Sequence, residues 1–527
     1  MQIRVLTTIV LSLATVLLPV VSNGQTVKVR GGLVSGFPGK DPSIITYKGI
    51  PFAAPPVGSL RWRAPQPIVA WPGVLKAEKF SASCIQQIVS EFGPWTYEFM
   101  AHNEVSEDCL YLNVFTPAKS ASEQRPVFVH IYGGGFMQGS SAAPIYDGEG
   151  LAKKGLVVVT FNYRVGALGF LAHPELTSES GHQASGNYGL MDQIAALRWV
   201  HDNIARFGGD PNNVTIAGQS AGSMAVHDLT ASPLAKGLFH RAIAQSGGST
   251  VGGVGINVEP TPLAAAEAEG QKFAEAKGAH SLAELRGLSW QKILEPIPGA
   301  NPMSGPRFAP VVDGYVLPAP FMQTIAEGKQ NDVETLTGNT VGELGGLFAS
   351  GAPITAKQFE EQARKRYGDK ADEFLKLYPA ATDEQAQTAQ RESTRDQAVV
   401  ALYLWARVRS KTARTKVYEY LWDHALPGPD AAKYGAFHSS EIPYVMNTLD
   451  ESKRPFSDAD RKIAATMSSY WANFAATGNP NGPGLPVWTA IGEKPEIMEV
   501  GDTTGAIPVA GSPVKIEFFE AFLSQSR

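Results

Sequence analysis

Short apolar runs rich in β-branched residues alternate with a longer amphipathic stretch in the first half of the chain. The runs 126–132 (PVFVHIY), 156–163 (LVVVTFNY), 213–218 (NVTIAG) and 239–245 (FHRAIAQ) have the composition of buried strands. Segment 187–207 instead repeats its apolar residues every three or four positions, which predicts a helix. This alternation predicts an α/β fold, with a mostly parallel central sheet flanked by helices on both faces.

The stretch 355–413 is mostly helical in pattern and rich in Ala, Gln, Lys and Glu. No linker sets it apart, so we expect a helical elaboration of the sheet near the C-terminal half of the chain. The sequence has no repeat period, low-complexity tract or charge block. We therefore predict a single domain over residues 25–527.

Residues 1–24 have the pattern of a secretory signal peptide. Basic Arg4 precedes an apolar run over 5–21, and small residues follow at Ser22 and Gly24. An uncleaved membrane anchor is the alternative, but the run is slightly short for a span of about 20 residues. We expect cleavage after Gly24, export to the periplasm or the extracellular space, and no stable membrane association of the mature protein.

Export changes what the two cysteines predict, because an oxidising compartment favours disulfides. Cys84 and Cys109 would form one bridge and close a loop that contains Trp95, Tyr97 and Phe99. Such a bridge stabilises a fold by about 3 kcal/mol in the chain-entropy model. Two free buried thiols are the alternative. The aromatic residues of the loop either line a site entrance or serve packing alone.

The composition is that of an ordinary globular protein, with 43% apolar and 18% charged residues among 527. Disordered and collagen-like chains are therefore excluded. The net charge of −5, from 45 basic and 50 acidic residues, leaves no concentration of positive charge for a phosphate backbone. Nucleic acid is not an expected partner.

The most informative motif is 218–222 (GQSAG), which fits the pattern G-x-S-x-G between a predicted strand and a predicted helix. A sharp strand-to-helix turn holds such a serine in a strained conformation, and only small neighbours avoid clashes there. The turn also places the hydroxyl at a helix N-terminus, which favours a developing negative charge. Ser220 is therefore the candidate nucleophile.

A serine hydroxyl needs a base to take its proton, and the base needs an orienting acid. In this type of fold the order along the chain is Ser, then Asp or Glu, then His. Among the later histidines, His438 lies in a small-residue stretch suited to a loop, 435–440 (GAFHSS). Glu343 directly follows a strand-like run, 336–342 (LTGNTVG), and is the candidate acid.

An oxyanion hole is also required, because negative charge develops on the former carbonyl oxygen. Segment 130–136 (HIYGGGF) ends a predicted strand with three glycines, the pattern of an early oxyanion loop. A flexible turn or a phosphate loop is the alternative. No Lys follows and no helix-opening G-x-G-x-x-G is present, which disfavours phosphate binding.

Longer segments resemble the type-B carboxylesterases, the family that includes cholinesterases and para-nitrobenzyl esterases. Segment 207–222 (FGGDPNNVTIAGQSAG) is similar to the family's nucleophile signature, and 107–114 (EDCLYLNV) to its second signature. Shorter similar segments are 47–53 (YKGIPFA), 162–164 (NYR) and 473–475 (NFA). The resemblance covers nearly the whole chain after the signal segment and implies an α/β-hydrolase fold.

The resemblance also implies roles for individual residues. They are Ser220, Glu343 and His438 as nucleophile, acid and base, Gly134, Gly135 and Ala221 as oxyanion donors, and Cys84 and Cys109 as the family's first disulfide. Two positions depart from the family pattern. Gln219 stands where many relatives have Glu, which makes a cationic choline-type substrate less favourable, and Leu344 stands where Gly is usual.

The implied activity is hydrolysis of small-molecule carboxylic esters through an acyl-enzyme, without a metal or an organic cofactor. A lipase acting at oil–water interfaces and an esterase specialised for one natural product are alternatives within the same chemistry. A non-catalytic binding protein on the same scaffold is the rival of another class. Such proteins typically lack a member of the triad, whereas all three candidates are present here. The sequence predicts no particular oligomeric state.

Overall fold

The computed structural model describes residues 25–248, 260–297, 308–343, 353–492 and 494–525. The expected signal peptide at 1–24 and Leu344, which was expected to depart from the family pattern, lie outside these residues.

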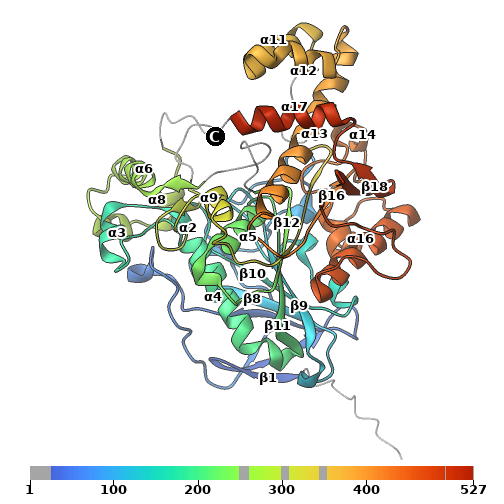
Figure 1. Cartoon of the computed structure of the whole chain (residues 1–527). Coiled ribbons are helices and arrows are strands. Elements are labelled where there is room, and N and C mark those ends of the chain that lie inside the picture. Colours follow the sequence, from blue (N-terminus) through green and yellow to red (C-terminus); the bar gives the residue numbers. More distant parts are fainter. Residues whose placement is uncertain (1–24, 249–259, 298–307, 344–352, 493, 526–527) are drawn as a thin grey trace, which may run out of the picture.

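Eleven strands of the described residues form one central sheet (Figure 1). In order across the sheet they are β18 (Thr504–Pro508), β17 (Glu496–Val500), β16 (Val417–Trp422), β15 (Glu334–Thr340), β12 (Arg241–Gln245), β11 (Gly209–Gln219), β9 (Arg125–Ile131), β10 (Val157–Phe161), β8 (Tyr111–Thr116), β4 (Ile45–Pro51) and β3 (Phe37–Pro38). Neighbouring strands from β17 to β10 are parallel. The pairs at the two edges are antiparallel. The predicted α/β fold with a mostly parallel sheet is confirmed.

Shorter strands pair outside this sheet. They are β1 (Thr26–Val29), β2 (Gly32–Ser35) and β5 (Val74–Lys76), then β6 (Ser83–Cys84) with β7 (Val105–Ser106), and β13 (Thr261–Pro262) with β14 (Val311–Val312). The described α-helices are α1 (Glu149–Ala152), α2 (Gly166–Phe170), α3 (Pro174–Glu179), α4 (Tyr188–Asn203), α5 (Ala221–Ala231), α6 (Leu263–Ala276), α7 (Leu282–Gly287), α8 (Trp290–Leu294), α9 (Phe321–Ala326), α11 (Ala356–Tyr367), α12 (Ala371–Leu377), α13 (Asp383–Arg409), α14 (Ala431–Tyr434), α15 (Ile442–Met446), α16 (Asp458–Thr477) and α17 (Pro513–Gln525).

Helices cover both faces of the sheet, as the side chains of β16 demonstrate. Consecutive side chains of a strand point to opposite faces. Tyr420 packs against Trp471 of α16, with ring centroids 5.2 Å apart. The next residue, Leu421, belongs instead to an apolar cluster that includes Trp405 of α13. Helices α16 and α13 therefore lie on opposite faces of the sheet.

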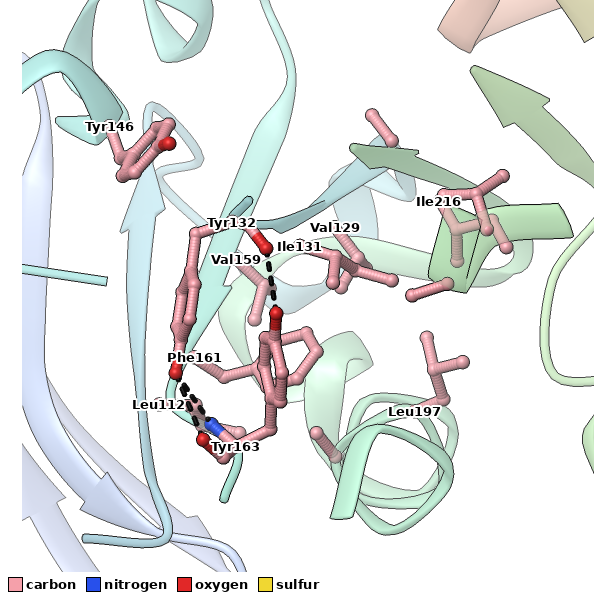
Figure 2. Close-up of a cluster of buried hydrophobic side chains, with 14 of the residues drawn as sticks. Leu112, Val129, Ile131, Tyr132, Tyr146, Val159, Phe161, Tyr163, Leu197 and Ile216 are labelled. Atoms are coloured by element: carbon pink, nitrogen blue, oxygen red, sulfur yellow. Dashed lines mark hydrogen bonds between the residues drawn. The ribbon is translucent and has the colours of Figure 1, made fainter. Parts of the chain in front are cut away.

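The core beneath the carboxyl ends of the strands contains two tyrosines that are tied together (Figure 2). Tyr132 follows β9 and Tyr163 follows β10, and each hydroxyl donates a hydrogen bond to the other residue's carbonyl at 2.9 Å. Both side chains are almost fully buried. Each hydroxyl thus has a partner in apolar surroundings, and the turn after β9 is fixed to the turn after β10.

The helical stretch expected over 355–413 forms α11, α12 and α13. Helices α11 and α12 project beyond the sheet at the top of Figure 1, and α17 lies across α13. These helices contribute Phe359, Phe374 and Phe518 to the apolar cluster that also contains Leu421 of β16. In the described ranges, no helix combines the length and the apolar character that spanning a bilayer requires.

Candidate active site

Ser220 occupies the turn between β11 and α5, with a backbone φ of 59° and ψ of −125°. This region is rarely adopted by residues other than glycine, so surrounding contacts must hold it. One contact is the Ser220 N–H, which donates to the Gln245 carbonyl at 2.9 Å. A Cβ on Gly218 would lie 2.4 Å from the Gly222 carbonyl carbon, and a Cβ on Gly222 would lie 2.1 Å from the Ile131 carbonyl oxygen. The turn therefore requires both glycines of the motif.

Ser220 lines a cavity of about 310 Å³ at the carboxyl ends of the parallel strands. His438, Gly134 and Gly135 line the same cavity. Much of its remaining wall is apolar and comes from Ile88, Val89, Phe92, Trp95, Phe99 and Met100. Ligand sites of open α/β sheets lie at this edge of the sheet.

Glu343 and His438 meet beside the cavity, although 95 residues separate them. His438 Nδ1 lies 2.6 Å from Glu343 Oε2, and the other carboxylate oxygen accepts the Thr340 N–H at 2.8 Å. The two loops are joined by a hydrogen bond from the Gly342 N–H to the Ala436 carbonyl at 3.0 Å. A carboxylate only accepts hydrogen bonds, so Nδ1 carries the proton and Nε2 is left as the acceptor.

Gln219, the residue before the serine, contacts this acceptor. Its Nε2 lies 3.2 Å from His438 Nε2, and its side chain is buried. Among the described residues, no hydrogen bond joins the Ser220 hydroxyl to the His438 ring. Catalytic hydrogen bonds often tighten only when substrate is bound. Gln219 Nε2 also lies 3.4 Å from His438 Nδ1, so its amide lies against the imidazole ring and not on the axis along which Ser220 would donate to Nε2.

Free backbone donors lie on two sides of Ser220. Gly134 and Gly135 follow β9 with φ of 110° and 66°, and Ala221 is the first residue of α5. Within the described part of the chain, the N–H groups of these three residues have no hydrogen-bond acceptor. Unpaired N–H groups around a cavity can bind an oxyanion, and the N-terminus of α5 adds a favourable dipole.

Comparison with known proteins gives the family. The model of the carboxylesterase family matches residues 23–515. The chain belongs to the carboxylesterase family. It is 37% identical to fumonisin B1 esterase of Sphingopyxis macrogoltabida, over 90% of this chain and 86% of the relative. It is 32% identical to human cocaine esterase, over 95% and 91% of the two chains. With para-nitrobenzyl esterase of Bacillus subtilis the identity is 33%, over 89% and 93%. The resemblance to type-B carboxylesterases is confirmed, and the protein is a carboxylic-ester hydrolase.

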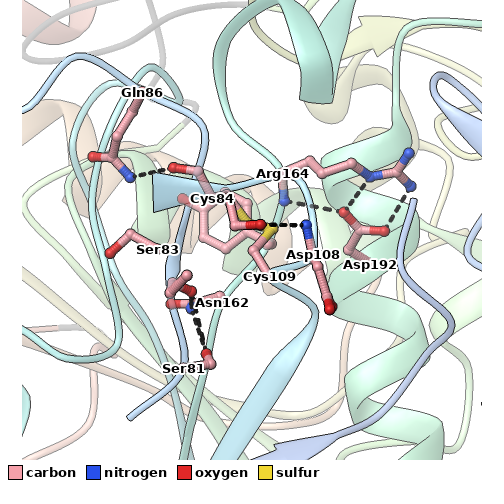
Figure 3. Close-up of a disulfide and its surroundings, with 12 residues drawn as sticks. Ser81, Ser83, Cys84, Gln86, Asp108, Cys109, Asn162, Arg164 and Asp192 are labelled. Atoms are coloured by element: carbon pink, nitrogen blue, oxygen red, sulfur yellow. Dashed lines mark hydrogen bonds and ion pairs between the residues drawn. A yellow bond between two sulfur atoms is a disulfide. The ribbon is translucent and has the colours of Figure 1, made fainter. Parts of the chain in front are cut away.

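The disulfide of this carboxylesterase joins Cys84 and Cys109, whose Cα atoms are 5.0 Å apart (Figure 3). The aromatic residues of the loop were expected either to line the site entrance or to serve packing, and Trp95 does both. Its ring lines the cavity and also packs edge-on against Phe437 at 5.8 Å. Tyr97 is 55% exposed and does not line the cavity.

A second carboxylic acid lies behind the histidine of the esterase, and the sequence did not single it out. Glu441 is fully buried, and its Oε1 accepts hydrogen bonds from Gln245 Nε2 at 3.4 Å and Ser246 Oγ at 3.5 Å. Burial first, and then the negative charge of Glu343, raise the pKa of Glu441 to about 7. No sequence motif identifies a buried glutamate three residues after a histidine, so Glu441 could not be predicted from the sequence.

Sequence reasoning also missed polar residues that line the cavity, among them Gln86, Tyr146 and Ser439. Ser439 has a φ of 85°, and its hydroxyl lies 3.5 Å from the indole nitrogen of Trp95. Gln86 follows a cysteine by two positions and contacts the glycine-rich turn after β9. Neither residue belongs to a pattern that indicates chemistry.

Proposed function

We propose that this esterase cleaves carboxylic esters with Ser220 as the nucleophile, His438 as the base and Glu343 as the orienting acid. The observation that carries the proposal is the 2.6 Å contact between His438 Nδ1 and Glu343 Oε2 beside the cavity that Ser220 lines. Ser220 Oγ forms a bond to the ester carbonyl carbon, and its proton passes to His438 Nε2. Glu343 stays ionised and stabilises the imidazolium that results.

The intermediate carries its negative charge on the former carbonyl oxygen. The N–H groups of Gly134, Gly135 and Ala221 bind this oxygen. When the intermediate collapses, the bond to the alcohol oxygen breaks and that oxygen takes the proton from His438, which leaves an acyl-enzyme. Water then attacks the acyl group through the same steps and releases the carboxylic acid.

We propose neutral esters as the substrate class, with an aromatic or aliphatic acyl group. In the described part of the chain, the cavity lining has no Asp, Glu, Lys or Arg, and an uncharged wall offers no partner for an ionised substrate. The volume of about 310 Å³ suits a small to medium ester. The relatives are named for fumonisin B1, cocaine and para-nitrobenzyl esters, so their names select no single substrate.

A lipase is the second candidate, and exposed apolar side chains at the cavity favour it. Ile88 is 50% exposed, Val89 36% and Phe92 45%, and all three line the cavity. Apolar residues around an entrance can contact an aggregated lipid. A specialised natural-product esterase remains the alternative if simple esters are poor substrates.

The test is hydrolysis of para-nitrophenyl esters from acetate to palmitate by the wild type and by Ser220→Ala. We expect turnover of short and medium chains by the wild type and a loss of at least about 1,000-fold in the variant, with an unchanged unfolding curve. Equal turnover by the folded variant would contradict the assignment of Ser220. A sharp rise in rate above the solubility limit of the substrate would identify the lipase. No turnover of any ester by folded wild type would favour the non-catalytic binding protein.

We also propose that the protein is exported, with residues 1–24 removed as a signal peptide. The basic, apolar and small-residue pattern of this segment supports the proposal, and so does the disulfide, because disulfides persist in oxidising compartments. The protein then acts in the periplasm or outside the cell and begins at Gln25. Mass spectrometry of the exported protein tests this, and a mass that includes residues 1–24 would contradict it.

A further inference from the structure

The glycine-rich turn after β9 holds one residue with a side chain in a backbone conformation that ordinarily only glycine adopts. Gly134, Gly135 and Gly139 have φ between 66° and 126°, and Phe136, which is not a glycine, has φ of 61°. Such conformations cost about 1–3 kcal/mol for a residue with a side chain and persist only where surrounding contacts hold them. Contacts outside the turn must therefore keep it in place.

One of these contacts comes from a single buried side chain, Gln86, which is 4% exposed. Its Nε2 donates to the Gly139 carbonyl at 2.7 Å, and its Oε1 accepts the Gly139 N–H at 2.8 Å. The Gln86 amide thus pairs with both the backbone N–H and the carbonyl of Gly139, as the backbone of a neighbouring β-strand would. A Cβ on Gly139 would lie 2.4 Å from the Tyr132 ring, so Gly139 itself has little room to move.

Gln86 is anchored in turn by the disulfide. The second hydrogen of its amide bonds to the carbonyl of Cys84 at 3.0 Å, and Cys84 is bridged to Cys109 (Figure 3). The Gln86 amide therefore bonds to the disulfide-bridged Cys84 and, at the same time, to Gly139 of the turn. Between Gly139 and the donors, the carbonyl of Gly134 accepts the N–H groups of residues 137 and 138 at 3.1 and 3.2 Å. Gly139 is thus connected to Gly134 through its covalent neighbour Gln138, whose N–H makes one of these hydrogen bonds.

We propose that Gln86 is a positioning residue for the oxyanion hole, which acts by fixing Gly139 and thereby the N–H groups of Gly134 and Gly135. This inference rests on the proposed function. Donors stabilise an oxyanion only when they are fixed in advance at the position the oxygen will take. Small displacements of such groups can reduce rates by about 100-fold. Loss of the Gln86 amide therefore weakens binding of the transition state more than binding of the ester.

The test compares Gln86→Met, which keeps the length of the side chain without its hydrogen bonds, with the wild type on para-nitrophenyl butyrate. We expect kcat to fall by about 10- to 100-fold with KM changed less than about 2-fold. A trifluoromethyl ketone, which adds to the serine and carries its charge on the former carbonyl oxygen, should lose affinity by a similar factor. The control is Gln362→Met, an exposed position on α11 that does not line the cavity, which should behave as the wild type.

The outcomes separate this inference from the proposed function. If the folded wild type hydrolyses no ester, the proposed function fails first. If the wild type is active and Gln86→Met has the same kcat and inhibitor affinity as Gln362→Met, the positioning role is refuted. A fall in kcat that merely follows a loss of titratable active sites would indicate partial unfolding and would also refute it. Gln86→Ala serves as the second variant if Gln86→Met does not fold.

Discussion

At the scale of single residues, the contact of Gln219 with the proposed catalytic histidine has a consequence that can be measured. Its amide lies 3.2 Å from His438 Nε2 in a buried position. In Gln219→Glu, a carboxylate would face the ring and favour its protonated form, which cannot act as a base. We expect the acidic limb of the profile of kcat/KM against pH to move upward by about one pH unit.

The matched control for this prediction is Gln87→Glu, because Gln87 is exposed at the same cavity. Water screens a charge at that position, so its profile should coincide with that of the wild type. Equal shifts in both variants would point to a general effect of charge. An unshifted acidic limb in Gln219→Glu would mean that Gln219 does not contact the base during turnover.

The sequence predicts those site residues for which the catalytic chemistry or the backbone geometry allows only one or two residue types. Gly218 and Gly222 are required because a Cβ at either position would clash with backbone. The contact between Glu343 and His438 was expected from chain order and resemblance, and the structure brings the two side chains together. Gln86 could not be predicted, because its pairing with the Gly139 backbone is defined only after the chain has folded.

At the scale of elements, the central strands were predictable because both of their faces are buried. The strand β10 is buried at every position, and such strands are continuous apolar runs. The edge strand β18 was not predicted, because its residues are partly exposed and do not form a continuous apolar run. The sequence of β18 is TGAIP, none of its residues is fully buried, and it pairs antiparallel with β17.

The boundaries of the predicted elements shift where tertiary contacts extend or end them. The predicted strand at 213–218 begins earlier, because Gly209 pairs with Arg125 across an irregularity in register. The predicted helix at 187–207 ends as an α-helix at Asn203 and tightens to a 3₁₀ turn through Phe207. Gly208, with φ of 80°, then terminates it.

At the scale of the whole molecule, the stability of the fold depends on carboxylic acids that are buried without ionic partners. Glu419 on β16 is 1% exposed, and neither of its oxygens has a hydrogen-bond partner among the described residues. Burial therefore raises the pKa of Glu419 well above its ordinary value of 4.5. The folded protein keeps this proton at pH values where the unfolded chain has lost it.

The pH dependence of unfolding follows from that difference. Above about pH 4.5 the unfolded chain binds fewer protons at Glu419 than the folded protein, so this side chain makes stability fall as pH rises toward the folded pKa. Glu419→Gln cannot titrate. We expect its free energy of unfolding, relative to the wild type, to rise by up to about 1.4 kcal/mol per pH unit between pH 5 and 8 in urea titrations.

Glu496→Gln, at an exposed position on β17, should keep the pH profile of the wild type. A difference for Glu419→Gln that stays constant from pH 5 to 8 would mean that Glu419 is ionised to the same extent in the folded and the unfolded protein, and would contradict the prediction.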